Sequence, residues 1–586
     1  MRLKVSKSKN STSFYVTKSV YINKKEKTIT VEKLGTEIAL KEKLGNVDIL
    51  QWAKDYVAEL NRLEKEGKEP IVKTEFNPSM QIDSNKKVSF NGGYLFLQDI
   101  YNDLKIPKIC KEISQNHKFE YDLDSILSRL IYSRIMYPCS KLATNEISKG
   151  FIEKPNFELH HIYRALDILS EEMDLIQSSL YKTSIKLSKR NTGILYYDCT
   201  NFFFETEEEE GLKRYGKSKE NRPNPIVQMG LFIDGDGIPL AFNINKGNTN
   251  EQITLKPLEE KILSDFELSK FIVCTDAGLS GKSNKLFNSK KDRAFITTQS
   301  IKKLDKTLKE WALNNEGWYI EGDNSPEHNE NGEKIRKTYD ISSFTDEEKE
   351  KYKNIIFYKQ RWVIDGRLEQ NLIVTFSLKY QSYQRKIRNQ QLERARKLLD
   401  KSSGKYNKKH TSDPKRFIKA IPSTDDGEVA TNMSLTIDYD LVSEEEKYDG
   451  IYAVYTNLED EPKEIVKANK WRWQVEECFR IMKSEFEARP VYLKKDNRIE
   501  AHFLTCFISL LLYRLLEKKM GEKYTTNELI STLKNMNFLE VEGEGYIPTY
   551  ERTDVTDDLH ENFGFRTDYQ IVTLKNMKKI IKISKM

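Results

Sequence analysis

The sequence predicts a mixed α/β protein, in which a sheet with helices on its faces is interrupted by a β-rich insertion. Three changes in the apolar pattern predict this class. Residues 93–190 repeat their apolar side chains with the period of helices. Residues 192–298 switch to short apolar runs in the order strand, strand, strand, helix, strand, helix, strand, which is typical of a mixed sheet. Strand-like runs return between 300 and 455, and the helical period then resumes.

These changes divide the 586 residues into segments, as expected for a chain well above the ~100–200 residues of one domain. The expected segments are an amino-terminal basic β unit plus helix (1–67), a helical domain (93–190), a first part of the sheet core (190–300), the β-rich insertion (300–455), a second part of the core (455–520) and a carboxy-terminal tail (521–586). The polar residues 68–92 are the predicted linker.

Composition excludes several classes of protein. The six cysteines are scattered without a CxxC pair, and the seven histidines have no zinc-ligand spacing, so we expect a reduced protein without a disulfide framework. The amino terminus lacks the apolar core of a signal peptide. The longest apolar stretch, Phe503 to Leu516, is shorter than the ~20 residues that cross a bilayer. We therefore expect a buried helix there, no membrane, and a cytoplasmic protein.

Two segments concentrate positive charge, although the net charge is only +6. Residues 1–33 hold nine Lys or Arg against Glu26 and Glu32, and residues 381–420 hold thirteen against three acidic residues. Such segments can contact the phosphate backbone of DNA. The alternative is a solvated β face in the first segment and a solvated helix and loop in the second.

Three carboxylates from distant segments indicate a metal site. Asp198 stands just past the apolar run ILYY, Asp276 just past FIVCT, and Glu476 in the basic segment KANKWRWQVEECFRIMKSEFEARP. Hard cations such as Mg²⁺ or Mn²⁺ take oxygen ligands, and two such ions can serve phosphodiester chemistry. The alternatives are a turn residue at the end of a strand for Asp198 and a helix N-cap for Asp276.

A single helix through Glu476 would place cations beside it. At 100° per residue, one narrow face contains five polar residues: Asn469, Arg472, Glu476, Arg480 and Lys483. A neighbouring apolar stripe could dock on the sheet. The alternative is a solvated face with ion pairs four residues apart. The segment FYKQRWVIDGRLEQ begins like the segment around Glu476, with Asp365 in the place of the glutamate. Seven residues after Asp365, however, stands Leu372 instead of a lysine or arginine, so we interpret Asp365 as non-catalytic.

These residues resemble the DDE transposases of bacterial insertion sequences, in the branch with a Tyr-x2-Arg-x3-Glu-x6-Lys helix and a β-rich insertion before it. The motifs that carry the resemblance are YYDCTNFFFE, PLAFNINKGNTNE, CTDAGLSGKSN, YDGIYAVYTN and WRWQVEECFRIMKSEFEARPVYL. The resemblance implies an RNase H-like catalytic core. It implies that Asp198, Asp276 and Glu476 are catalytic and bind Mg²⁺ or Mn²⁺, as two ions. Arg472, Trp473, Arg480 and Lys483 are the expected DNA-binding residues. Asn469 occupies the tyrosine position of the signature, and Trp473 is the neighbouring aromatic that would compensate.

The implied function is that of a transposase in a bacterial, nucleoid-associated setting. It would bind double-stranded DNA at the ends of an insertion sequence, cleave phosphodiester bonds by metal-assisted hydrolysis and join the freed 3′-OH ends to target DNA, acting as a homodimer. Two alternatives remain open. One is an RNase H-like nuclease without strand transfer. The other is a catalytically inactive DNA-binding protein, whose mark would be a lost carboxylate.

Overall fold

The computed structural model divides the chain into two compact units. Unit 1 comprises Met1–Ile168, Glu485–Glu487 and Leu511–Met586, and unit 2 comprises Leu169–Ser484 and Ala488–Leu510. The structure describes all residues except 9–10, 23–24, 46, 66–71, 73–78, 80, 82, 85, 324–326, 329–333, 400–412 and 424–431.

Unit 1 begins with a small antiparallel sheet. Its elements are β1 (Arg2–Ser8), β2 (Ser11–Ile22), β3 (Lys25–Thr36), α1 (Glu37–Leu44) and α2 (Ile49–Lys65). Alternation along β2 turns Phe14 inward, where it packs with Leu40, Ile49 and Ala53 of the helices. The two longer strands and the second helix follow the predicted pattern, whereas β1 and α1 were not expected.

The rest of unit 1 combines helices with a four-stranded sheet. The helices are α3 (Tyr94–Asp103), α4 (Ile106–Asn116), α5 (Leu123–Met136), α6 (Lys141–Ser148), α7 (Leu159–Glu171), α18 (Thr526–Asn535), α19 (Asp554–Phe563) and α20 (Leu574–Ile583). The strands are β4 (Ser89–Asn91), β18 (Asn537–Val541), β19 (Gly545–Pro548) and β20 (Val572–Thr573), in the order β20-β19-β18-β4.

The segment expected as a carboxy-terminal tail is therefore folded, which corrects that description of residues 521–586. Its strand β18 pairs with β4, more than 400 residues earlier in the chain, with Phe538 opposite Phe90. Both phenylalanines are buried. A strand pairing over such a separation leaves no local signal in the sequence, which is why the segment looked like a tail.

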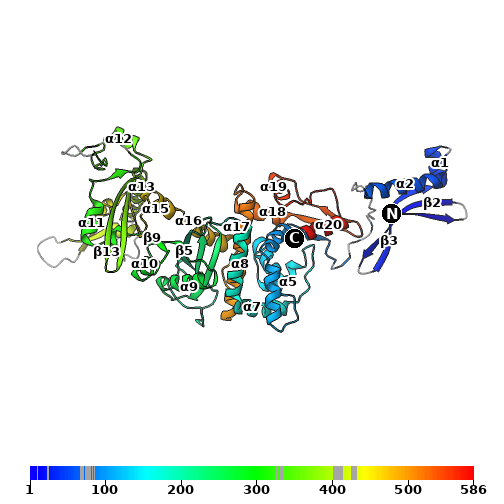
Figure 1. Cartoon of the computed structure of the whole chain (residues 1–586), viewed down its shortest axis with the longest axis horizontal. Coiled ribbons are helices and arrows are strands. Elements are labelled where there is room, and N and C mark those ends of the chain that lie inside the picture. The colour runs from blue at the N-terminus through cyan, green and yellow to red at the C-terminus, as the bar shows by residue number, and fades with distance from the viewer. Residues whose placement is uncertain are drawn as a thin grey trace. The chain divides into compact units, whose positions relative to one another are not determined.

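Unit 2 is built on a nine-stranded mixed sheet (Figure 1). In spatial order its strands are β10 (Tyr319–Ile320), β13 (Phe357–Asp365), β14 (Leu368–Phe376), β17 (Ile451–Thr456), β9 (Ala294–Gln299), β8 (Ile272–Thr275), β5 (Ile194–Phe203), β6 (Ile226–Asp234) and β7 (Pro239–Lys246). β8 pairs in parallel with both β5 and β9, and the other neighbours are antiparallel. The mixed α/β class is confirmed. Strands from residues 300–455 extend this same sheet through the pairing of β17 with β9.

Helices and two small hairpins complete unit 2. The helices are α8 (Met173–Leu187), α9 (Leu255–Asp265), α10 (Lys282–Asn288), α11 (Lys306–Leu313), α12 (Asp346–Lys351), α13 (Leu378–Leu399), α14 (Tyr439–Glu446), α15 (Pro462–Lys470), α16 (Trp473–Arg480) and most of α17 (Asp496–Lys519). The hairpins are β11 (Glu327–His328) with β12 (Lys334–Ile335), and β15 (Ile418–Ser423) with β16 (Asn432–Ile437). Among the described helices, α17 alone is long and apolar enough to cross a membrane, but 94% of its apolar window is buried inside the protein.

Alternation along β5 determines which residues face the site. Leu195, Tyr197 and Cys199 belong to one apolar cluster with residues of α9. The intervening residues therefore lie on the other face of the sheet, where the Tyr196 hydroxyl donates to the Ala468 carbonyl of α15 at 3.0 Å. Asp198 and Thr200 share this second face because they follow Tyr196 at intervals of two.

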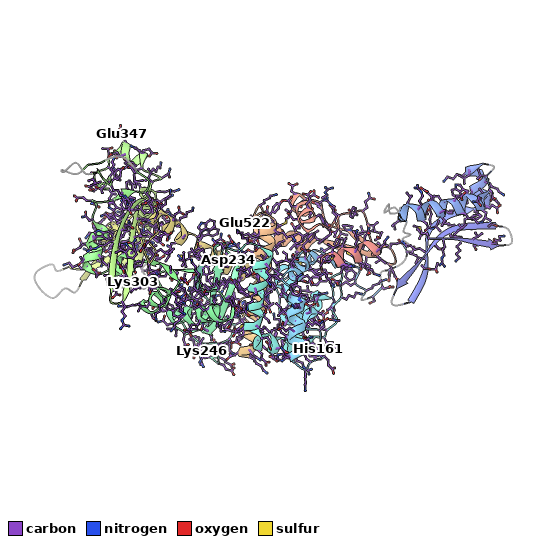
Figure 2. The ribbon with its side chains drawn as sticks, viewed as in Figure 1. His161, Asp234, Lys246, Lys303, Glu347 and Glu522 are labelled. Atoms are coloured by element: carbon purple, nitrogen blue, oxygen red, sulfur yellow. The ribbon has the colours of Figure 1, made fainter. Side chains whose placement is uncertain are left out.

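A buried ion pair anchors the start of β5. Nε of Arg190 lies 2.6 Å from Oδ2 of Asp234, which is labelled in Figure 2, and both side chains are fully buried. The guanidinium also donates to the carbonyl oxygens of Ile238 and Pro239 at 3.0 Å each. These contacts tie the residues before β5 to the turn between β6 and β7.

Candidate active site

The register of two parallel strands brings Asp198 and Asp276 together. Tyr196 of β5 stands opposite Cys274 of β8, and two residues further along each strand stand Asp198 and Asp276. Residues opposite one another in parallel strands point to the same face, and the strands lie ~4.8 Å apart. Asp276 follows the end of β8 as predicted, but Asp198 lies inside β5, which continues to Phe203. That position corrects the expectation of an aspartate just past a strand, because residues 198–203 continue the ladder with β6.

One oxygen of each aspartate is held by the backbone. Oδ1 of Asp198 accepts the amide of Cys199 at 2.8 Å. Oδ1 of Asp276 accepts the amides of Gly278 and Leu279 at 2.9 and 3.1 Å, which forms an Asx turn. Among the described residues, no hydrogen bond reaches either Oδ2. Asp276 is not a helix N-cap, because α10 begins at Lys282 after Gly281.

The electrostatics of Asp198 suit a bound cation. Burial raises the pKa of Asp198 to about 6, with a further increase from Asp276 that Lys219 and Arg472 oppose. Two neighbouring carboxylates in a desolvated place are unfavourable when both are ionised. A divalent cation between them would remove that cost, and their free oxygens are the ligands it prefers. The residues present therefore fit a Mg²⁺ or Mn²⁺ site.

The predicted single helix through Glu476 is wrong. α15 ends at Lys470, α16 begins at Trp473, and a π-helical turn follows at Ile481–Glu485. The amides of Trp471 and Arg472 bond to carbonyls three residues back, at 3.1 and 3.3 Å, so the chain tightens between the helices. The five polar residues consequently do not share one straight face, and Asn469 is buried with only 3% of its surface exposed.

Glu476 is held near this turn by Arg472. Nη1 of Arg472 donates to Oε1 of Glu476 at 3.2 Å, and 59% of the glutamate side chain is exposed. In the part of the chain that the structure describes, Oε2 accepts no hydrogen bond. The three predicted carboxylates do not form one of the described groups whose ligand atoms all lie within 4.8 Å of one another. The structure therefore joins Asp198 to Asp276, and Glu476 would have to turn from Arg472 to join them.

The four predicted DNA-binding residues have different surroundings. Arg472 pairs with Glu476 as described, and Trp473 is exposed and stacks against Trp471 with ring centroids 6.2 Å apart. Arg480 is exposed and pairs with Glu477 at 2.7 Å. Lys483 reaches β5, where its Nζ donates to Oγ1 of Thr200 at 2.6 Å, on the same face as Asp198.

Lys219 is a further candidate site residue, which the sequence did not indicate. Its Nζ donates to the carbonyl of Cys199 and lies 3.3 Å from the carboxylate of Glu251. Burial alone would lower the pKa of Lys219, but Asp198 and Glu251 outweigh it and raise that pKa. Lys219 lies in the polar segment between β5 and β6, which has no periodicity, so only the fold identifies it.

A pocket of ≈ 540 Å³ lies beside Glu476. Aromatic and basic side chains line much of it: Lys379, Tyr380, Tyr383, Tyr452, Lys470, Arg472 and Trp473. They come from α13, from β17, from the end of α15, from the turn that follows it and from the start of α16. The pocket can therefore accept an anionic group next to the predicted catalytic glutamate.

Other acidic groups are accounted for by ion pairs. Asp365 ends β13 and pairs with Lys282 at 2.7 Å, with both side chains about half exposed. In unit 1, one atom each of Asp557, His560 and Asp568 lie within 4.8 Å of one another. Arg552 and Arg566 already pair with these carboxylates. Their positive charges make this cluster a poor cation site.

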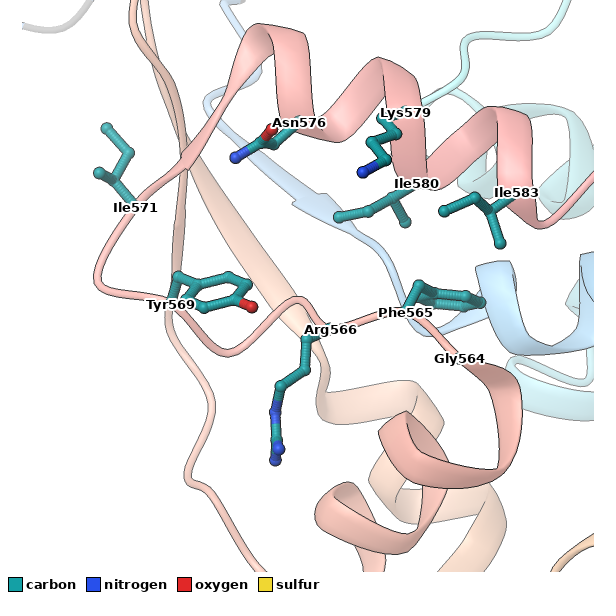
Figure 3. A pocket seen from close by; sticks show the side chains of 9 residues that line it. All are labelled: Gly564, Phe565, Arg566, Tyr569, Ile571, Asn576, Lys579, Ile580 and Ile583. Carbon is teal, nitrogen blue, oxygen red and sulfur yellow. The ribbon is translucent and has the colours of Figure 1, made fainter. Parts of the chain in front are cut away.

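Unit 1 also contains a pocket of ≈ 440 Å³, shown in Figure 3. Phe565, Arg566 and Tyr569 line one side, and Lys579, Ile580 and Ile583 of α20 line the other. Its side chains are mainly apolar and basic, with Asn576 as a polar neutral residue. The pocket belongs to a different unit from the aspartates of β5 and β8.

Comparisons with known proteins give two findings. The model of the family described as "Transposase DDE domain" matches residues 201–512, a stretch that contains Asp276 and Glu476 and begins three residues after Asp198. The chain is also similar to a solved structure, the cryo-EM structure of piggyBac transposase synaptic complex with hairpin DNA, with 9% identity, 84% of each chain covered and a TM-score of 0.34. No curated protein matches the chain.

Proposed function

Because the chain belongs to the family of transposase DDE domains and is a DDE-type transposase, we propose that it cleaves the ends of its own insertion sequence and joins them to target DNA. In the first step water attacks a phosphodiester at the element end, and the P–O bond to the 3′ oxygen breaks. In the second step the freed 3′-OH attacks a phosphodiester of the target strand and displaces that strand's own 3′ oxygen.

The observation that carries the proposal is the pair of aspartates side by side on β5 and β8. Each offers one oxygen that accepts no hydrogen bond from the described residues, and burial keeps the surroundings of Asp198 poorly solvated. We interpret strands β5 to β9 as an RNase H-like core. The strands from residues 300–455 would be the β-rich insertion, joined to the core edge through β17.

Asp198, Asp276 and Glu476 would hold Mg²⁺ or Mn²⁺, in our proposal as two ions. When bound, such ions lower the pKa of an attacking water and stabilise the charge on the leaving oxygen. Glu476 lies on α16, one turn after Arg472, so breaking their 3.2 Å ion pair would free the carboxylate for this role. The Glu476 side chain is 59% exposed, so water can solvate its carboxylate when the pair breaks.

The cations around the carboxylates would bind the DNA backbone. Arg472 has a planar guanidinium that can hold two phosphate oxygens at once, and Lys483 places a charge beside β5. Arg480 is exposed one turn further along and would exchange Glu477 for a phosphate. Trp473 offers an exposed ring for stacking. The basic segments 1–33 and 381–420 would add phosphate contacts along double-stranded DNA.

We further propose that the protein acts as a homodimer on paired element ends, in the bacterial cytoplasm near the nucleoid. Cutting one end alone would leave a broken donor, so activity that depends on a partner avoids this product.

The test is to incubate the purified protein with DNA fragments that carry the ends flanking its own gene, together with a plasmid target and Mg²⁺. We expect cleaved ends and joined products, and joining separates the transposase from a nuclease without strand transfer. Asp198→Ala, Asp276→Ala and Glu476→Ala should each abolish cleavage while retaining DNA binding in a gel shift. Asp365→Ala is the matched control, since it removes a carboxylate that pairs with Lys282 at the surface. Full cleavage by one of the first three variants would refute that residue's assignment.

A further inference from the structure

The row of side chains that contains the two aspartates continues onto β9. Thr275 of β8 stands opposite Thr297 of β9, and their hydroxyls are 3.0 Å apart. The next residue along each strand is Asp276 on one side and Thr298 on the other. These two residues are therefore neighbours on the opposite face of the sheet. Because parallel neighbours lie ~4.8 Å apart, Thr298 is one strand from Asp276 and two strands from Asp198.

A tyrosine hydroxyl is held at the end of this row. The hydroxyl of Tyr452, on β17, lies 2.8 Å from Oγ1 of Thr298. Nδ2 of Asn469 donates to the Tyr452 oxygen at 2.5 Å and to Thr298 at 3.3 Å. Oδ1 of Asn469 accepts a hydrogen bond from Cys274 at 3.3 Å, which fixes the orientation of the amide. Asn469 itself is buried.

This arrangement leaves the phenol as a donor. Its oxygen already accepts the amide hydrogen of Asn469, so its single proton can turn either to Thr298 or to another acceptor. Burial raises the pKa of Tyr452, so the hydroxyl keeps its proton at neutral pH.

A guanidinium with one unsatisfied N–H group also lines this pocket. Tyr452, Arg472 and Glu476 all line the ≈ 540 Å³ pocket. Nε of Arg472 is buried and has no hydrogen-bond partner in the described chain. A buried donor without a partner is costly, so it indicates an acceptor that arrives with a ligand. A hydroxyl and a guanidinium side by side are suited to the oxygens of a phosphate.

We propose that the Tyr452 hydroxyl binds, together with Arg472, a DNA phosphate next to the cleaved one, and that Asn469 is the residue that positions this hydroxyl. The inference rests on the proposed function and adds a residue to its site. It also differs from the sequence-based expectation for Trp473, because the phenol of Tyr452 is held by hydrogen bonds to Thr298 and Asn469 whereas the indole of Trp473 is exposed.

The experiment compares two tyrosines of one strand. Tyr452→Phe removes the hydroxyl in the pocket. Tyr455→Phe removes a hydroxyl on the opposite face of β17, where the ring is buried in an apolar cluster beneath Lys285. Both variants are assayed for end cleavage on wild-type ends and on ends with one neutral methylphosphonate at successive positions around the cleavage site. We expect Tyr452→Phe to reduce kcat/KM by about 10- to 100-fold, the range for a hydrogen bond to a charged group. Tyr455→Phe should stay within about twofold of the wild type.

The neutral phosphate identifies the bound position. At one position next to the cleavage site, the methylphosphonate should slow the wild type and Tyr455→Phe but cause little further decrease in Tyr452→Phe, because the hydrogen bond is already absent there. Equal decreases in all three proteins at every position would overturn the inference. So would a Tyr452→Phe protein as active as Tyr455→Phe. If the wild type cleaves no ends at all, the proposed function fails instead.

A second pair of variants tests Asn469. Asn469→Leu should reduce cleavage in the wild type yet add little in the Tyr452→Phe background, because both changes remove the same oriented donor. A purely structural role of Asn469 would reduce activity by the same factor in both backgrounds, and that result would refute the positioning role.

Discussion

Glu259 is expected to make the stability of unit 2 fall as the pH rises. The residue lies on α9 and is fully buried. Nδ2 of Asn288, on α10, donates to its Oε1 at 2.7 Å, while Oε2 has no hydrogen-bond partner among the described residues. Helices α9 and α10 precede and follow β8 in the chain, and Asp276 stands at the end of that strand.

The sign follows from a raised pKa. Burial raises the pKa of Glu259 from 4.5 to about 8, although Asn288 and Arg293 oppose the increase. Below pH ~4.5 the carboxyl is protonated in both the folded and the unfolded chain, so it contributes no pH dependence. Between pH ~4.5 and ~8 the unfolded chain loses the proton and the folded chain keeps it, so the free energy of unfolding decreases. Above pH ~8 both states are ionised, and the decrease is complete.

The magnitude follows from the difference between the two pKa values. At about 1.4 kcal/mol per pKa unit, a shift of roughly 3.5 units corresponds to about 5 kcal/mol as an upper value. Because the structure relaxes around the ionised group, we expect the free energy of unfolding to decrease by a few kcal/mol. Glu259→Gln keeps the shape of the neutral acid and cannot ionise, so it should match the wild type near pH 4.5 and exceed its stability by that amount at pH 8.5.

The assay is urea unfolding followed by tryptophan fluorescence at several pH values. Five of the six tryptophans lie in unit 2, so the signal reports mainly on that unit: Trp311, Trp318, Trp362, Trp471 and Trp473. Glu260→Gln, at an exposed neighbouring position, is the control and should follow the wild type. If the free energy of unfolding of Glu259→Gln runs parallel to that of the wild type from pH 4.5 to 8.5, Glu259 does not cause the loss of stability.

Further predictions concern the metal, the DNA, the assembly and the fold. Activity should require Mg²⁺ or Mn²⁺, with Ca²⁺ supporting DNA binding but not turnover, and undiminished cleavage in excess EDTA would contradict this. Removing Ser402 to Lys415, a segment mostly outside the described residues, should flatten the slope of log affinity for DNA against log salt by about one unit for each phosphate that the loop neutralises. An unchanged slope would show that the loop is solvated and contacts no phosphate. Mixing inactive Glu476→Gln protein into the wild type should reduce paired-end products more steeply than the wild-type fraction if the protein acts as a dimer, whereas a linear decrease would indicate independent subunits. Asp234→Ala leaves the buried charge of Arg190 without its partner, so chemical unfolding should show a destabilisation of about 3–5 kcal/mol, and a value below about 1 kcal/mol would contradict the role of the pair.

Local patterns in the sequence predicted the mixed sheet and the aspartate at the end of β8. Apolar runs of strand length indicated β5, β6, β7, β8 and β9, because each run buries its side chains in the same sheet. The position of Asp276 followed directly from the end of such a run. Asp198, Thr200 and Asn201 interrupt the apolar run of β5, so the sequence suggested too early an end for that strand.

Contacts between distant segments could not be predicted from local patterns. The register that places Asp198 beside Asp276 depends on the pairing of β5 with β8, about eighty residues apart. Lys219 reaches the site from a loop that shows no pattern of its own, and Tyr452 comes from a strand that the sequence indicated without its contact to Thr298. The break between α15 and α16 likewise arises from packing, since the sequence continues its helical period through it.

The candidate residues for the chemistry can be selected from the sequence, because carboxylates, cations and apolar periods are properties of residues and their neighbours. Which of these residues meet depends on the folded chain, because strand register and the burial of charge involve segments far apart in the sequence. For this transposase, Asp198, Asp276 and Glu476 stand out in the sequence. The hydrogen bonds among Thr298, Tyr452 and Asn469 exist only once β9, β17 and α15 have packed together.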